Sequence, residues 1–190
     1  MTIRTTIVAS TALLALAACS RGSEGTQANT TTVQTSETTG AAPAPQASER
    51  ASTGFVNAAA ASDAFEIETS RIALANGASA AVKSYAQKMI DAHTASTAKL
   101  KTIAAGLAPT MTPTPALSPE QQEKVDQLKT IRGSAFDQAY IAGQAAGHQQ
   151  TLDMLKIYAT TGETPQLKTF ANDLIPIVTA HLNMVKGLKA

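Results

Sequence analysis

Residues 72–90, IALANGASAAVKSYAQKMI, decide the fold, because the same pattern returns as IYATTGETPQLKTFANDLI at residues 157–175, offset by 85 positions. In each copy a helical pattern stops at a glycine, Gly77 or Gly162, and a Ser or Thr two residues later can cap a new helix. One helical hairpin cannot bury its apolar face alone, so the repeat indicates two similar hairpins packed together. We therefore expect an all-α protein, an antiparallel four-helix bundle built from two similar hairpins.

Caps, glycines and prolines predict where the helices begin and end. We expect four helices, over residues 53–75, 79–105, 118–160 and from 164 onward. Residues 106–115, with three prolines, form the long connection between the hairpins. The third helix is expected to bend at Gly133, and the fourth to kink at Pro176, which lacks a backbone N–H. Residues 54–190 thus form the folded domain.

The N-terminal residues have the features of an export signal. Arg4 is followed by an apolar run over residues 7–18, too short to span a bilayer as a stable helix. Leu16-Ala17-Ala18-Cys19 resembles a bacterial lipobox, so residues 1–18 are predicted to be a lipoprotein signal peptide and Cys19 the lipidated first residue. The alternative is an ordinary secretory signal and a soluble periplasmic protein.

Residues 19–53 read as a tether between this lipid and the domain. They are mostly Ser, Thr, Gly, Ala, Pro and Gln, and cannot bury enough apolar surface to offset the entropy of ordering. Ser20, an uncharged residue after the lipobox, is typical of sorting to the outer membrane. We expect a protein held on the periplasmic side of that membrane.

Composition excludes several classes of function. The net charge of +1 and the scattered lysines make no basic stripe, so no nucleic-acid partner is expected. The chain has a single cysteine and therefore no internal disulfide. It also has no Gly-rich phosphate loop, no serine on a nucleophile elbow and no CxxC motif.

The three histidines of the chain occupy buried-seam positions on three different helices. The fourth helix shows its seam most cleanly, at Leu167, Phe170, Leu174, Ile177, His181, Met184 and Leu188. If the turns at Gly77 and Gly162 share one end, a rise of about 1.5 Å per residue places His93 about 24 Å, His148 about 21 Å and His181 about 28 Å from that end. The three imidazoles are therefore expected at nearly one depth.

The first helix offers carboxylates at the same level. The offset of 85 pairs His148 with Asp63, and Glu66 lies one turn closer to the end that carries Gly77. Which face of this helix points inward stays open, because its large apolar residues do not define one stripe.

Imidazoles and a carboxylate that converge in a helical core suit a transition-metal ion such as zinc, copper or iron. The predicted metal ligands are Glu66, His93, His148 and His181, with Asp63 as a possible further ligand. The alternative is a structural or adaptor bundle, with an unidentified protein partner, in which the same residues form a buried polar layer with trapped water.

Several short stretches also resemble a known family. They are Phe55-Val56, Glu66-Ile67-Glu68, Tyr85 to Ile90 leading to His93, Phe136 to Tyr140, His148, and Leu174-Ile175-Pro176 leading to His181-Leu182. Together they are similar to the bacterial domain-of-unknown-function family 4142, a ferritin-like group of outer-membrane or periplasmic proteins.

The resemblance implies a ferritin-like bundle in which Glu66, His93, His148 and His181 fall on the family's recurrent polar positions, without an established activity. The Glu-x-x-His pairs of di-iron proteins are absent, because Ile90, Ala145 and Val178 stand three residues before the histidines. A di-iron oxidase or other redox enzyme is therefore not expected, and no other enzyme activity is predicted.

Overall fold

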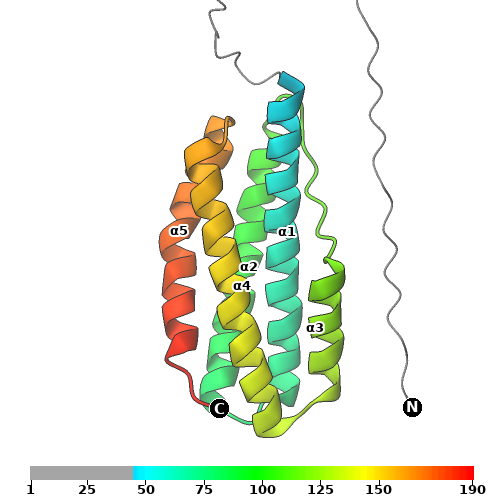
Figure 1. Cartoon of the computed structure of the whole chain (residues 1–190), viewed down its shortest axis with the longest axis vertical. Helices are drawn as coiled ribbons and strands as arrows, with labels where there is room; N and C mark the ends of the chain where they lie inside the picture. The colour runs from blue at the N-terminus through cyan, green and yellow to red at the C-terminus, as the bar shows by residue number, and fades with distance from the viewer. Residues whose placement is uncertain (1–44) are drawn as a thin grey trace, which may run out of the picture. The chain divides into compact units, whose positions relative to one another are not determined.

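The computed structural model describes residues 45–190, which form five helices and no strand. The helices are α1 (Pro45–Asn76), α2 (Ala80–Ala105), α3 (Pro119–Thr130), α4 (Gly133–Thr161) and α5 (Pro165–Lys186) (Figure 1). The all-α prediction is confirmed. Within the described part of the chain, no helix has the length and hydropathy needed to cross a membrane. Cys19, the predicted signal peptide and most of the predicted tether lie outside the described residues.

The first helix begins at Pro45, well before the cap predicted at Thr53, so the last residues of the predicted tether are helical. Ser52, one residue before that cap, is buried, and its hydroxyl lies 2.9 Å from the Tyr158 hydroxyl and 2.8 Å from that of Thr164. These contacts fasten the start of α1 to the turn between α4 and α5. The contacts of Ser52 thus hold the end of the predicted tether against the domain, while residues 46–51 before it are mostly exposed.

The third predicted helix is wrong as a single element, because the chain breaks before Gly133. Ile131 and Arg132 are extended, with ψ of 158° and 164°, and Gly133 has φ of +68°. That left-handed conformation favours glycine, which has no Cβ to clash with the backbone. The predicted bend is thus a full interruption that separates α3 from α4.

The two hairpins are inverted relative to each other. Gly77, in the turn after α1, pairs with Gly133 at the start of α4, whereas Thr164, in the turn after α4, contacts Ser52 near the start of α1. The two hairpin turns therefore lie at opposite ends of the molecule, and the connection after α2 returns the chain along α1, against which α3 packs (Figure 1). The assumption that the depths of the histidines share one reference end was wrong. The rings still meet, because His93 and His148 lie near the middle of α2 and α4, and His181 lies on the C-terminal third of the shorter α5.

A carboxylate from α4 holds the turn between α1 and α2. Asp137 is buried, and its two oxygens accept the backbone N–H groups of Ala78 at 3.1 Å and Ser79 at 2.8 Å. Gly77 allows this approach, since a Cβ there would lie 2.8 Å from the Ala73 carbonyl oxygen and 3.0 Å from Oδ1 of Asp137. The repeated glycine at this position is therefore needed for space.

We expect Asp137→Ala to lower the free energy of unfolding by about 3 kcal/mol, because two hydrogen bonds to a charged group disappear at a partly buried turn. The matched control is Asp153→Ala on the same helix, where the exposed carboxylate bonds only to Gln149 four residues earlier. This control should change stability by less than about 0.5 kcal/mol. Urea unfolding measures both values, and equal losses in the two variants would contradict the role given to Asp137.

The buried seam of α5 differs from the predicted one. Its buried residues are Leu167, Phe170, Ala171, Val178, His181, Leu182 and Val185. Ile177 and Met184 were expected in the core but are 45% and 37% exposed. The buried set repeats at eleven residues, from Leu167 to Val178, which follows a straight helix better than the strict seven-residue spacing assumed from the sequence.

Candidate metal centre

Helices α2, α4 and α5 bring the three histidines into one buried cluster. The ring centroids of His93 and His148 lie 5.6 Å apart, those of His93 and His181 5.7 Å, and those of His148 and His181 5.4 Å. One ring nitrogen of each histidine lies within 4.8 Å of the corresponding nitrogens of the other two. The side chains are buried, with 1% to 7% of each residue exposed. The convergence expected from the seam positions is thus present in the structure.

Apolar helix faces carry the imidazoles inward. Met89 and Leu100 are buried on α2 on either side of His93, and Leu152 and Leu155 are buried on α4 beyond His148. These residues are spaced by three, four or seven positions, so they share one face of their helix. Because that face is packed in the core, it carries the rings of His93 and His148 inward.

The outer nitrogens of two rings are held by oxygen atoms. Nδ1 of His93 lies 2.8 Å from Oδ1 of Asp63, and the other carboxylate oxygen accepts a hydrogen bond from the Thr97 hydroxyl at 3.1 Å. Nδ1 of His148 donates to the carbonyl oxygen of Gln144 at 2.8 Å. Because a carbonyl only accepts, the neutral His148 ring carries its proton on Nδ1 and a lone pair on Nε2.

The inner nitrogens have no such support. Within the described residues, Nε2 of His93, Nε2 of His148 and Nδ1 of His181 are buried and make no hydrogen bond to the protein. Buried polar atoms are nearly always hydrogen-bonded, so three unpartnered nitrogens in one place require an explanation. Rings fixed by carboxylate or carbonyl oxygens at one nitrogen, and free at the other, have the arrangement of metal-ligating histidines.

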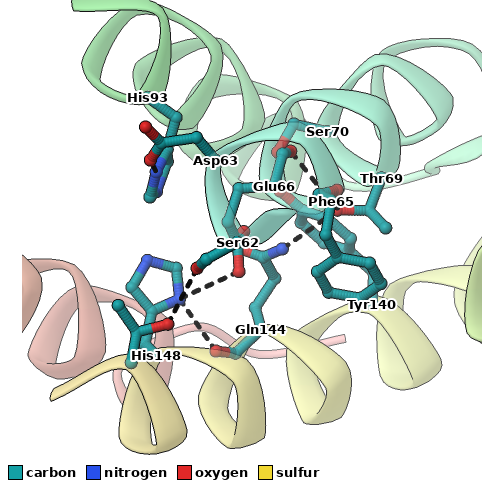
Figure 2. A network of polar contacts seen from close by, with 11 residues as sticks. Ser62, Asp63, Phe65, Glu66, Thr69, Ser70, His93, Tyr140, Gln144 and His148 are labelled. Atoms are coloured by element: carbon teal, nitrogen blue, oxygen red, sulfur yellow. Dashed lines mark hydrogen bonds and ion pairs between the residues drawn. The ribbon is translucent and has the colours of Figure 1, made fainter. Parts of the chain in front are cut away.

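Glu66 lies beside Nδ1 of His148 and is not among the residues whose ligand atoms converge. Its Oε1 is 3.7 Å from Nδ1 of His148, the nitrogen that donates to Gln144, while its Oε2 has no hydrogen-bond partner within the described residues. Gly147 leaves room for it, since a Cβ there would lie 3.1 Å from Oε1. Figure 2 shows Glu66 between α1 and α4, beside Gln144. The group of converging nitrogens thus contains the three histidines, with Asp63 and Glu66 around it.

The three imidazoles differ in pKa, because burial and neighbouring charges act on them to different extents. Burial, and then the charge of His93, lower the pKa of His148 to about 3 and that of His181 to about 4. Burial also acts to lower the pKa of His93, but its hydrogen bond to Asp63 and the charge of Glu66 outweigh this and raise it above 6.5. At neutral pH two of the three imidazoles are therefore neutral, which is the form that binds a metal ion.

Burial also raises the pKa of the Glu66 carboxyl to about 7, although the nearby His93 charge opposes the shift. Glu66 therefore exchanges a proton near neutral pH, and its ionised form can offset positive charge in the cluster. A buried carboxyl of this kind is a common feature of functional sites, and also of structural ion pairs.

A polar network that the sequence analysis did not predict surrounds the site. The Gln144 amide donates to the Thr69 hydroxyl at 3.2 Å, and the hydroxyls of Ser70 and Tyr140 lie 2.8 Å apart (Figure 2). The one available signal was Gln144 itself, which stands a helical turn before His148. The network ties α1 to α4 and fixes the helix that carries Asp63 and Glu66.

Fold and cluster together define an all-helical protein with three buried histidines placed to hold a metal ion. The chain belongs to the family described as domain of unknown function DUF4142, which it matches over residues 36–188. The resemblance noted from the sequence is thereby confirmed. No curated protein and no solved structure matches the chain.

Proposed function

We propose that the protein binds one transition-metal ion through His93, His148 and His181. The proposal is carried by the convergence of the three rings: one ring nitrogen of each histidine lies within 4.8 Å of those of the other two. Each ring also has a buried nitrogen without a hydrogen-bond partner within the described residues. A bound ion would take up all three lone pairs at once. Two of the rings are already neutral at pH 7, so most of the cost of deprotonating the ligands is absent.

An all-imidazole ligand set suits zinc first, with copper and iron as competitors. Asp63 and Glu66, predicted from the sequence as ligands, are assigned here to the second layer around the ion. Asp63 orients His93 through Nδ1, and Glu66 lies beside the Nδ1 side of His148. Such partners set ring orientation and basicity, and their loss lowers metal affinity about 10- to 100-fold.

The same proposal covers the fold type and the location. A single long connection between two hairpins, with α2 and α4 running in the same direction, supports a ferritin-like four-helix bundle in which α3 belongs to the connection (Figure 1). The lipobox at residues 16–19 supports a lipid anchor on Cys19 and a place on the periplasmic side of the outer membrane. The protein is thus proposed to be an envelope lipoprotein that binds metal, and we assign it no reaction.

A second candidate function is a structural or adaptor bundle with a metal-free polar core. The observation in its favour is that part of the buried polar layer is hydrogen-bonded within the protein, through the Asp63 contact of His93 and the Gln144 contact of Thr69. In that role the layer would specify how α1 pairs with α2 and α4, a use for which buried polar groups are known.

The test is the metal content of the protein prepared without a His tag and equilibrated by dialysis with zinc, copper or iron. We expect about one ion per chain, because three ring nitrogens can form one tetrahedral site with an open position. Elemental analysis measures the ratio. A protein that retains no metal, and whose melting temperature is unchanged when metal is added, would favour the adaptor instead.

A further inference from the structure

A pocket reaches the histidine cluster from the surface between α2 and α5. Its volume is about 240 Å³, and His93, His181 and Asp63 line its inner end. Its walls are mostly apolar, and include Leu155, Leu174 and Val178. Two of the three histidines with unpartnered nitrogens therefore border a space that a small molecule could enter.

Charge at the mouth of the pocket is neutralised by the protein. Lys99 and Asp173 line the pocket and form an ion pair, with Nζ 2.7 Å from Oδ2, and each side chain is about half exposed. The pair joins α2 to α5 and leaves no uncompensated charge on the wall. A ligand in this pocket would thus be recognised mainly by apolar contacts with the walls and by the polar groups at the inner end, which include the two histidines.

We propose that this pocket binds a small exogenous ligand that completes the coordination of the ion proposed above, on whose binding this inference rests. Three protein ligands leave a tetrahedral ion with one open position. The ligand class that fits is a single nitrogen or oxygen donor carried on a compact apolar body. Its donor atom faces the histidines and its body packs against Leu155, Leu174 and Val178.

A second pocket, of about 360 Å³, approaches from the side of α3 but does not serve this purpose. It reaches Glu66 and is bordered by polar residues such as Glu120 and Lys124, and none of the three histidines lines it. It therefore borders the Glu66 carboxylate, whereas the pocket between α2 and α5 is bordered by two of the three histidines.

The test uses the Co²⁺-loaded protein, because the visible spectrum of Co²⁺ changes when a ligand enters its coordination sphere. The probes are imidazole and 4-phenylimidazole. Both should shift the spectrum without removing the metal, and the phenyl compound should bind at least about tenfold more tightly because its ring is buried against apolar walls. Metal retention is checked by elemental analysis after gel filtration.

A matched pair of variants locates the binding site. Ala95 lines the pocket, whereas Ala98, also exposed on α2, does not. Ala95→Phe should fill part of the pocket, weaken binding of 4-phenylimidazole about tenfold and leave Co²⁺ affinity unchanged. Ala98→Phe should leave both the 4-phenylimidazole affinity and the Co²⁺ affinity unchanged. Both positions are at the surface, so circular dichroism should show an intact helical fold in each.

Different results would contradict the metal site and the ligand pocket. Failure to bind Co²⁺ at all would overturn the proposed metal site and, with it, the ligand pocket. Binding of Co²⁺ without a spectral change on adding either probe would overturn the pocket alone. Equal weakening by Ala95→Phe and Ala98→Phe would likewise show that the ligand does not occupy the space between α2 and α5.

Discussion

Replacing His148 with alanine is expected to lower zinc affinity by more than about 100-fold. Removing a residue that only supports a ligand lowers metal affinity about 10- to 100-fold, and the loss of a ligand itself should be larger. The ring of His148 is the most buried of the three, and its tautomer is already set by the Gln144 carbonyl, with the lone pair on Nε2. The variant therefore loses a pre-oriented ligand. Isothermal titration of the untagged protein with zinc, against a competing chelator, measures the change.

The same substitution should remove the thermal protection that zinc provides. At a free zinc concentration 100 times the dissociation constant, binding to the folded state alone adds about 2.7 kcal/mol to stability. His148→Ala should show almost none of this gain. Because the variant also leaves a cavity, its own melting temperature without metal is the reference.

Gln149→Ala is the matched control, since Gln149 is the next residue on α4 and is exposed. It should keep both the affinity and the thermal protection. Unchanged zinc affinity in His148→Ala would show that the ion binds elsewhere or that the cluster is a metal-free polar layer.

Sequence patterns located the histidines because they lie among apolar residues at helical spacing, but the same reasoning could not orient α1. Its large buried apolar residues are Phe55, Val56 and Phe65, and the rest of its inward face carries Asp63, Glu66, Thr69 and Ser70 together with small alanines. Hydrophobic periodicity cannot detect a face made of polar and small residues. Its burial depends on partners from other helices, such as His93 for Asp63 and Tyr140 for Ser70.

The repeat correctly predicted where the two hairpin turns fall in the sequence. It did not predict that they lie at opposite ends of the molecule. Both copies end a helix at the same offset, with α1 ending at Asn76 and α4 at Thr161. Which end of the molecule each turn occupies depends on the connection over residues 106–118, whose path is set by tertiary packing. Asp63 was nevertheless identified through the offset of 85, although the inverted hairpins show that this pairing did not reflect a shared end.

Asp63→Ala should cause a large loss of stability in the absence of metal. Asp63 is 5% exposed and contacts both His93 and Thr97, so its removal leaves a buried imidazole and a hydroxyl without partners. Removing one member of a buried ion pair costs about 3–5 kcal/mol. Urea unfolding of metal-free protein at about pH 6 measures it, with Asp91→Ala, an exposed aspartate on α2, as the control that should change little.

The loss should shrink as the pH rises, and this dependence tests the charge on His93. The folded-state pKa of His93 is raised above 6.5 by Asp63 and Glu66, so the stability from its protonated form is present below about pH 6.5 and disappears as pH rises through the raised value. Without Asp63, burial dominates and the folded protein no longer favours the protonated ring. Once the His93 ring is neutral, the two proteins differ only by the hydrogen bonds of His93 and Thr97 to the Asp63 carboxylate, so at about pH 9 the loss should fall to about 1–3 kcal/mol.

A double-mutant cycle with His93→Ala separates this pair from its surroundings. His148 and His181 stay neutral between pH 6 and pH 9. The cycle is run in a Glu66→Gln background, because the pKa of Glu66 depends on the charges of His93 and Asp63. The coupling energy between Asp63 and His93 should be about 2 kcal/mol or more near pH 6 and clearly smaller near pH 9. A coupling energy that stays constant over this range would mean that His93 is neutral beside Asp63, and that the cluster enters metal binding with all three rings already deprotonated.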